Sequence, residues 1–451
     1  MKRIIFSNAL LPSGWAHNVA LEIDDQGIIA KVSLDDIDEN LIVDGYALPG
    51  MNNIHSHAFQ RAMAGLAEYA TSEQDSFWTW RDIMYRFADK ITAADLEVIA
   101  TQLYLEMLKA GFVSVAEFHY LHHNEDGNLD MSHAIMNAAL ETGIGLCHLP
   151  VLYNSSGFGG LPLEEKQKRF GHDADGYINL LDDLLPIIQK NKDQNLGMAL
   201  HSLRAVPENV LKECLDRNPT PGPIHIHISE QMQEVKDCIA WSGKRPVEWL
   251  YDNIDVDKRW CLIHATHLND KEVKMIARSG AVVGLCPATE ANLGDGLFPL
   301  RAYLDNGGQM AIGSDSHISI SIVEELRLLE YGQRLKYQKR NIATSKQEMH
   351  SGTNLYLNAL KGGAQASGFD NGVIEVGKRA DIIVLDPASP LLAGTPVRHI
   401  IDRFIFNGNV NAVKNVFVGG SEVVSDYKHA REKQITGEFI ETMERLKKVL
   451  D

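Results

Sequence analysis

The stretch Pro49-Gly-Met-Asn-Asn-Ile-His55-Ser-His57 is a short β-rich run that ends in two histidines. Alternate side chains of a strand lie on one face, so both imidazoles are expected to point the same way. From this stretch onward the chain alternates. A short β-rich run ends in polar residues, and a helix-like segment then leads to the next run. That alternation is typical of α/β proteins with a parallel sheet.

Eight such runs are predicted as strands, with helical crossovers between them. They are Gly50–His57, Gly111–His119, Gly143–Tyr153, Gly197–Leu203, Pro223–Ser229, Trp260–His267, Ala281–Pro287 and Met310–Asp315. In the first crossover, Thr92 is predicted as a helix N-cap and Gly111 as the stop. Eight strands with helical crossovers predict a (β/α)8 TIM barrel.

The two ends of the chain show the shorter period of small antiparallel strands. We expect residues 1–48 and 370–424 to pair into one small β domain beside the barrel. The fold class is therefore α/β, a (β/α)8 TIM barrel with a small β-sandwich domain formed by the N- and C-terminal segments. The expected boundaries are 1–48 and 366–425 for the two parts of the β-sandwich, 49–365 for the barrel and 426–451 for a C-terminal helix.

Composition excludes several classes of protein. The 451 residues include 43 Lys and Arg against 60 Asp and Glu, a formal charge of −17, which argues against a partner bound through phosphates such as nucleic acid. No stretch approaches the ~18–20 apolar residues of a membrane helix, so no membrane partner is expected. The five cysteines are odd in number and widely spread, a pattern that favours reduced thiols in the cytoplasm.

Polar residues with metal-binding chemistry close several predicted strands, at the barrel end where such folds keep their active sites. They are His55, His57, His227, His264 and Asp315. Each alone has an ordinary structural explanation, such as a half-buried polar pair or a turn residue. Together, neutral imidazoles and one carboxylate favour Zn²⁺ or a similar divalent ion. His225 has the same parity as His227 and is expected one layer deeper, as a hydrogen-bonded core residue.

These positions, with Gly313-Ser-Asp315 and the late Gly372-Val-Ile-Glu-Val-Gly-Lys-Arg-Ala-Asp381, resemble the amidohydrolase superfamily over nearly the whole chain. The resemblance implies that His55, His57, His227 and Asp315 hold the metal. Binuclear members carry a lysine at the end of strand 4, where this sequence reads Met198-Ala-Leu-His201-Ser-Leu-Arg204. One metal per subunit is therefore expected, Zn²⁺ first and Fe²⁺ as the other candidate.

His227-Ile-Ser-Glu230 is similar to the mononuclear deaminase branch, in which the glutamate shuttles protons. Hydrolysis of an amidine-like C–N bond requires water to lose a proton and the departing nitrogen to gain one. Asp315 can take that proton, Glu230 can deliver one to the leaving ammonia, and His264 can hold the developing tetrahedral centre. Glu230, His264 and Asp315 are thus the predicted catalytic residues.

Four further segments resemble the formimidoylglutamate deiminase family of histidine degradation: His55-Ser-His-Ala-Phe-Gln60, Asp75-Ser-Phe-Trp-Thr-Trp-Arg81, Glu117-Phe-His-Tyr120 and His201-Ser-Leu-Arg204. That family converts N-formimidoyl-L-glutamate and water into N-formyl-L-glutamate and ammonia. The resemblance places Gln60, Tyr120, His201 and Arg204 against the substrate. It also implies that Arg81 reaches the neighbouring subunit's site, which requires at least a homodimer.

The residues agree with a dianionic substrate, because Arg204 with Tyr120 and Gln60 can hold carboxylates. One alternative is a related mononuclear aminohydrolase acting on a heterocycle, guanine- or triazine-like. Another is a barrel kept as a non-enzymatic scaffold. The long segment from Gln60 to Lys90 is rich in aromatic residues, which suggests a lid, a subunit interface or packing on the barrel rim.

Overall fold

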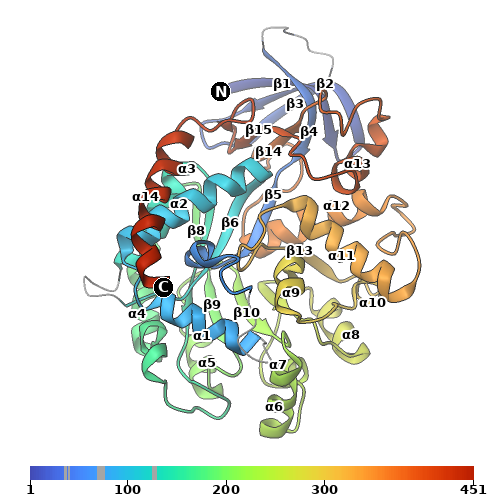
Figure 1. Cartoon of the computed structure of the whole chain (residues 1–451). Coiled ribbons are helices and arrows are strands. Elements are labelled where there is room, and N and C mark those ends of the chain that lie inside the picture. Colours follow the sequence, from blue (N-terminus) through green and yellow to red (C-terminus); the bar gives the residue numbers. More distant parts are fainter. Residues whose placement is uncertain (35–37, 39–40, 69–76, 124–128, 451) are drawn as a thin grey trace.

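The barrel wall of the computed structural model consists of eight parallel strands in chain order, as predicted (Figure 1). The structure describes residues 1–34, 38, 41–68, 77–123 and 129–450. The wall strands are β5 (Met51–Ser56), β6 (Phe112–His119), β7 (Gly145–Leu152), β9 (Met198–Ser202), β10 (Ile224–Ile228), β11 (Trp260–His264), β12 (Val282–Leu285) and β13 (Gln309–Ile312). A short additional strand, β8 (Gln194–Leu196), pairs with β7.

The wall closes between its last and first strands just beyond β13. The amide of Asp315 donates to the carbonyl of His55 (3.0 Å), and the amide of His57 donates to the carbonyl of Asp315 (3.2 Å). A parallel bridge joins Ser56 to Asp315. The Asn53 side chain accepts from the Ser314 amide at 3.1 Å. This seam therefore places two histidines and an aspartate side by side through the backbone alone.

Helices cover the outside of the wall, as the alternating sequence predicts. They are α2 (Ala93–Ala110), α3 (Asp130–Thr142), α4 (Ala174–Ile188), α5 (Glu208–Asp216), α6 (Met232–Ser242), α7 (Pro246–Asn253), α8 (Asp270–Ser279), α9 (Pro287–Leu293), α10 (Leu300–Asp305), α11 (Ile322–Tyr337) and α12 (Ser351–Ser367). One more helix, α1 (Phe77–Ala88), contributes side chains to the cavity described below. The predicted ends of the first crossover helix are confirmed in α2. Thr92 and Asp95 form a capping box, and Gly111 ends the helix with φ of 97°.

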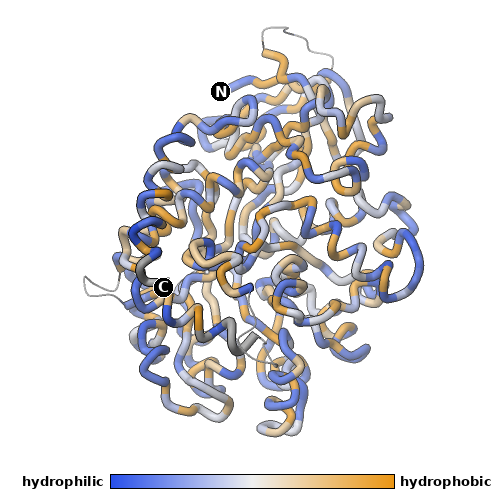
Figure 2. Tube along the Cα trace, in the orientation of Figure 1, coloured by the Kyte–Doolittle hydropathy of each residue, from blue (hydrophilic) through white to orange (hydrophobic). Residues whose placement is uncertain are grey.

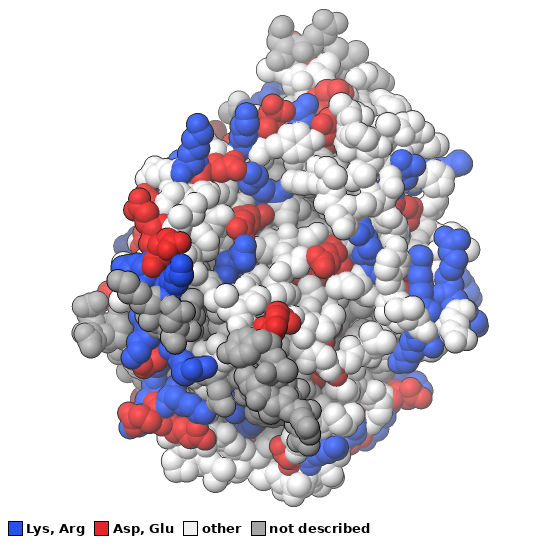
Figure 3. All heavy atoms as spheres, in the orientation of Figure 1, with Lys and Arg blue, Asp and Glu red and all other residues white. Residues whose placement is uncertain are grey.

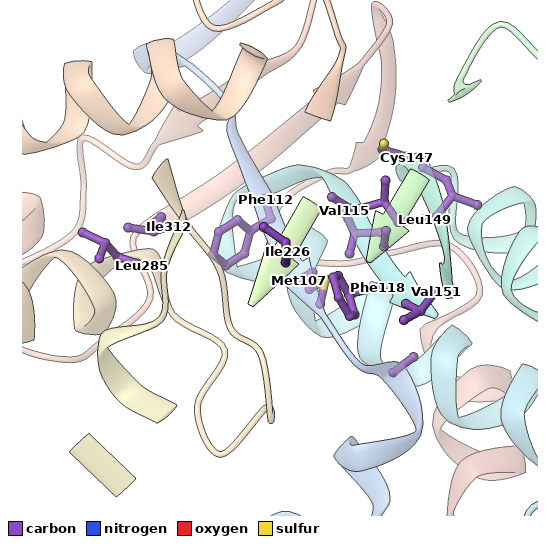
Figure 4. Packing of buried hydrophobic residues seen from close by; sticks show 14 of the residues in the cluster. Met107, Phe112, Val115, Phe118, Cys147, Leu149, Val151, Ile226, Leu285 and Ile312 are labelled. Atoms are coloured by element: carbon purple, nitrogen blue, oxygen red, sulfur yellow. The ribbon is translucent and has the colours of Figure 1, made fainter. Parts of the chain in front are cut away.

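The wall strands are buried on both faces, as expected for a parallel sheet covered by helices. Figure 4 shows Phe112, Val115 and Phe118 of β6 packed near Ile226 of β10. Hydrophobic residues follow these strands through the middle of the molecule, and hydrophilic residues gather on the surrounding helices (Figure 2). On the face seen in Figure 3, charged residues of both signs are interspersed around the edge.

The two ends of the chain pair into one sheet beside the barrel, as predicted, in the order β16-β15-β14-β4-β1-β2-β3. Its strands are β1 (Lys2–Leu11), β2 (Gly14–Ile23), β3 (Ile29–Leu34), β4 (Ile42–Pro49), β14 (Ile382–Leu385), β15 (Val413–Val418) and β16 (Ser421–Val424). The expected antiparallel pairing holds except for β1 and β4, which are parallel.

This terminal sheet curls over its own small core. Three strand steps separate β1 from β15, which would be about 14 Å in a flat sheet. The rings of Phe6 and Phe417, from these two strands, nevertheless meet edge to face with centroids 5.7 Å apart. The sheet therefore encloses a second core, distinct from that of the barrel.

The late Gly-Lys-Arg-Ala-Asp segment fastens this sheet to the barrel. The buried Arg379 guanidinium donates to Asp381 at 2.5 Å and to Asp193, which precedes β8, at 2.7 Å. Asp381 also accepts from the Asn371 side chain at 2.7 Å and from the Gly419 amide at 2.8 Å. Each buried charge is thus paired and hydrogen-bonded, as burial of charge requires.

The C-terminal part contains one helix that the sequence analysis missed. Residues expected to be strands include η4 (Val397–His399) and α13 (Ile400–Phe406). The terminal helix, α14 (Glu432–Leu450), begins four residues before the predicted Thr436 and packs on α2, where Thr436 donates to Gln102 at 3.2 Å. The domain boundaries remain predictions.

All five cysteines are buried and free, in agreement with the expected reduced thiols. Within the part of the chain that the structure describes, no helix has both the length and the apolar character needed to cross a membrane.

Candidate active site

The predicted metal ligands meet at the seam that closes the barrel. Nε2 of His55 lies 2.9 Å from Nε2 of His227. One carboxylate oxygen of Asp315 lies 3.6 Å from Nε2 of His55 and 3.3 Å from Nε2 of His57. Three ring nitrogens and a carboxylate therefore converge from β5, β10 and the segment after β13.

Two of these imidazoles are oriented by hydrogen bonds from their other ring nitrogen, Nδ1, to backbone carbonyls. Nδ1 of His57 lies 2.9 Å from the carbonyl of Phe118, and Nδ1 of His227 lies 2.9 Å from the carbonyl of His201. A carbonyl only accepts, so each Nδ1 carries the hydrogen and each Nε2 presents a lone pair to the cluster. Burial lowers the pKa of His57 to about 3 and that of His227 well below its usual value. Neutral imidazoles aimed at one point fit a divalent cation.

The backbone at this end of the barrel adopts conformations that non-glycine residues rarely use. Ser229, His264 and Asp315 have φ of 53°, 66° and 48°. Each follows or ends a wall strand, and the left-handed turn there costs roughly 1–3 kcal/mol per residue. Such strain persists where surrounding contacts enforce it, which is typical of active sites.

His264 lies between carboxylates, and its ligand atom is also within 4.8 Å of those of His55 and Asp315. Its Nε2 is 3.8 Å from Glu230 and 3.8 Å from Asp315, and its Nδ1 is 3.4 Å from Glu290. Burial lowers the pKa of His264, but these carboxylates outweigh burial and raise the pKa to about 10. His264 thus stands ready to donate hydrogen bonds into the site.

Glu230 is placed by the turn that follows β10. The Glu234 carboxylate at the start of α6 accepts from the amides of Ser229 and Glu230, both at 3.0 Å. Burial raises the pKa of Glu230, and nearby Glu290 contributes in the same direction. A carboxyl group with a raised pKa can both accept and release a proton, as the predicted shuttle requires.

The predicted substrate residues line the same cavity as the metal ligands. Nε2 of Gln60 donates to the Tyr120 hydroxyl at 2.7 Å. Nδ1 of His201 lies 3.2 Å from the Ser202 hydroxyl. The lining residues that the sequence analysis named are His57, Gln60, Arg81, Tyr120, His201, Arg204, His227, Glu230, His264 and Asp315.

Two arginines line the cavity as well. The Arg204 side chain, two residues beyond strand β9, lies beside Tyr153. Burial acts to lower the pKa of Arg204, but Tyr153, Tyr85 and Glu234 together raise it. The guanidinium carbon of Arg81, on α1, lies 5.5 Å from the centre of the Tyr85 ring. Both arginines are thus held beside aromatic rings at the wall of the cavity.

The aromatic segment before α2 contributes part of this wall. Tyr85 and Phe87 are buried, and the Tyr85 ring stacks on Phe170 with centroids 5.7 Å apart. For these two residues, packing on the barrel rim is therefore observed. Tyr69 lies outside the described residues, as do the side chains of Phe77, Trp78 and Trp80.

The sequence analysis missed two buried carboxylates that support the site. Glu290, on the first turn of α9, contacts His264 as described above and accepts from the Cys286 amide at 2.9 Å. Glu117 of β6 accepts from the Ala58 amide at 2.7 Å and from the Tyr104 hydroxyl at 3.1 Å. Burial raises the pKa of Glu117 to about 7. The Pro287-Ala-Thr-Glu290 sequence, which starts a helix directly after a strand, was the available signal for Glu290.

Two other histidines near the cluster, His225 and His317, were not predicted as metal ligands. Nε2 of His225 lies 2.7 Å from the carbonyl of Ala366, one layer below His227, as predicted. His317 supports the seam, with Nδ1 2.9 Å from the Ser314 hydroxyl and Nε2 accepting from the His57 amide at 3.2 Å.

Comparison with known proteins places this geometry in context. The amidohydrolase family model matches residues 46–423. Formimidoylglutamate deiminase of Pseudomonas aeruginosa is 49% identical over 452 residues, which cover 99% of this chain and 100% of that protein. The crystal structure of an amidohydrolase from Brucella melitensis has a TM-score of 0.93 at 42% identity and covers 99% of this chain and 100% of that one.

A more distant structure shares the fold. An adenosine deaminase from Xanthomonas campestris, solved with bound zinc, has a TM-score of 0.79 at 19% identity and covers 99% of this chain and 98% of that one.

Proposed function

The chain belongs to the amidohydrolase family, and from this premise we propose that it hydrolyses N-formimidoyl-L-glutamate to N-formyl-L-glutamate and ammonia. It is a hydrolase acting on the C–N bond of a linear amidine. The 49% identity to formimidoylglutamate deiminase over almost the whole chain supports this function over the heterocycle alternative. The reaction would belong to histidine degradation, and a cytoplasmic location would suit it.

One observation carries the proposal: the cavity carries both signs of charge. Glu230 and Asp315 line it together with Arg81 and Arg204. The substrate has the complementary arrangement, with a cationic formamidinium-like group at one end and two carboxylates at the other. A neutral purine or triazine ring has no group that needs two arginines.

The chain's own residues would orient the substrate in this cavity. Arg204 would pair with a carboxylate through two parallel hydrogen bonds. The Tyr120 hydroxyl accepts from Gln60, so its own proton remains to be donated to the substrate. Oε1 of Gln60 is buried without a hydrogen-bond partner and would accept from a substrate N–H. His201, whose pKa is lowered by burial and by Arg204, would bind as a neutral imidazole.

His55, His57, His227 and Asp315 would hold one Zn²⁺ per subunit, with Fe²⁺ as the other candidate, because the three imidazoles form one cluster and Asp315 contacts two of them. The ion supplies Lewis acidity, which makes water a nucleophile near neutral pH. Asp315 would take the proton that this water loses. As the C–N bond breaks, Glu230 would deliver a proton to the departing ammonia, and His264 would hydrogen-bond to the oxygen added to the carbon.

We also propose a homodimer in which Arg81 completes the neighbouring site. Arg81 lies on α1 and lines the cavity wall together with Arg204. An arginine on a segment at the edge of the cavity is well placed to be shared between subunits.

The decisive experiment measures ammonia released by the zinc-loaded protein from N-formimidoyl-L-glutamate and, in parallel, from guanine. We expect release from the first substrate alone. Ammonia release from guanine and none from N-formimidoyl-L-glutamate would contradict the proposal and support an aminohydrolase that acts on a heterocycle. A folded, metal-replete protein that acts on neither substrate would contradict both.

Replacing Glu230 with Gln is expected to lower kcat about 10²-fold. This is the lower end of the range for a proton-transfer residue, because His264 stands only 3.8 Å away and can donate in part. Steady-state kinetics with N-formimidoyl-L-glutamate would measure the change, and metal content should stay at the wild-type value. Glu230→Asp should recover part of the rate. An unchanged kcat in Glu230→Gln would remove Glu230 from the mechanism.

A further inference from the structure

Away from the barrel site, two imidazoles and a carboxylate gather where the C-terminal part meets α12. His350 precedes α12, His399 ends η4, and Asp402 lies on the first turn of α13. Each offers one ligand atom, and the three atoms lie within 4.8 Å of one another. Nδ1 of His350 is 2.7 Å from Asp402, and the two imidazole rings have centroids 4.8 Å apart.

The spacing is close to that of a bound transition metal. Bonds of about 2.0–2.1 Å in a tetrahedral zinc site separate neighbouring ligand atoms by roughly 3.4 Å. Side-chain rotations that move the ligand atoms by about 1 Å would therefore bring them to the spacing of a zinc site. All three residues are partly exposed, so an ion could enter from solvent and water could fill a fourth position.

The surroundings favour a cation over a purely structural ion pair. The Asp402 carboxylate already has a backbone role, because its second oxygen accepts from the Gly352 amide at 2.8 Å and caps α12. This contact fixes the carboxylate in place. Glu348 adds negative charge, since its carboxylate accepts from the His350 amide at 2.8 Å.

The His399 imidazole has a lone pair on Nε2. Nε of Arg398 donates to Nε2 of His399 at 3.0 Å, so Nε2 is an unprotonated nitrogen that can bind a metal ion. Arg398 is exposed and can turn into solvent, so a metal ion can replace it.

We propose that His350, His399 and Asp402 bind a second divalent ion of borderline character, Zn²⁺ foremost. Two imidazoles with one carboxylate select such an ion over Ca²⁺ or Mg²⁺, which prefer oxygen ligands. The bound ion ties the segment before α12 to η4 and α13. Because α12 packs on β5 and β13, the strands that lead to the seam, the ion stabilises the support of the barrel site without touching it.

The test counts metal on the full chain with its barrel site loaded. Wild type, His399→Ala and His17→Ala are equilibrated against buffers of stepped free Zn²⁺ and measured by elemental analysis. His17 is an exposed histidine of β2 and serves as the matched control. Wild type and His17→Ala should take up one equivalent more than His399→Ala, or bind it at least about tenfold more tightly. Adding Zn²⁺ should raise Tm in these two proteins and not in His399→Ala.

His399 is the chosen position because the fold does not depend on its ring, whereas Asp402 caps a helix. Melting with zinc chelated should therefore be the same for all three proteins. Ammonia release should also be unchanged, and a His227→Ala chain should keep the additional equivalent, so this result is independent of the proposed function. Equal zinc uptake by wild type and His399→Ala at every concentration would overturn the proposal.

Discussion

The His227→Ala variant is expected to purify with almost no metal at the barrel site and to release ammonia at least about 10⁴-fold more slowly than wild type. Nε2 of His227 points at Nε2 of His55 from 2.9 Å, so its removal takes one donor from the centre of the cluster. Loss of the cation forfeits several kcal/mol of transition-state stabilisation, and about 5.5 kcal/mol corresponds to that rate. Elemental analysis and an ammonia assay would measure the two effects.

The matched control is His225→Ala, two residues earlier on the same strand. His225 bonds the Ala366 carbonyl and faces no other candidate ligand within hydrogen-bond distance among the described residues. We expect this variant to be less stable to urea yet to retain its barrel metal. If both variants kept a full complement of metal, His227 would not be a ligand.

Arg204→Met should reduce kcat/KM for N-formimidoyl-L-glutamate about 10³-fold. Two hydrogen bonds between a guanidinium and a carboxylate contribute roughly 4 kcal/mol when both partners are charged. Methionine keeps the apolar length of the side chain and removes the charge. Steady-state kinetics with the natural substrate and with its diamide, which lacks both carboxylates, would separate the charge contact from a general loss of structure.

The diamide should be turned over at similar rates by wild type and Arg204→Met. Arg217→Met is the control variant, because Arg217 is exposed on the surface and pairs with Asp175 and Glu213. It should match wild type with both substrates. A loss in Arg204→Met that is equally large for the diamide would mean that Arg204 supports the fold rather than the carboxylate.

The barrel was predictable because its sequence signals are local. Each wall strand is a short β-rich run, and the parity of His55 and His57 alone determines that their rings share a face. The sequence also contained a signal for the helix α13. Its apolar residues recur at helical spacing, at positions 400, 401, 404 and 405. The segment was nevertheless assigned to strands because the segments around it have the alternation of strands.

The missing parts of the site depend on contacts that no local pattern contains. Glu290 meets His264 from a different strand-to-helix connection, in which β12 ends at Leu285 and Cys286 caps α9, with no neighbouring histidine in the sequence. Glu117 supports the turn after β5 from inside β6; its segment resembles the deiminase family, but the sequence does not say which backbone amide the carboxylate meets. Which buried carboxylates meet which histidines follows from three-dimensional packing alone.

The seam between β13 and β5 also orders events during synthesis. Roughly 260 residues separate His57 from Asp315, so a ribosome adding about 10 residues per second needs nearly half a minute to produce the second after the first. Until Asp315 has been added, the segment that pairs with β5 and closes the wall is missing, and so is the carboxylate that contacts His55 and His57. The closed wall and the predicted ligand set therefore become complete only once Asp315 has been added, and a polypeptide terminated before that residue has neither.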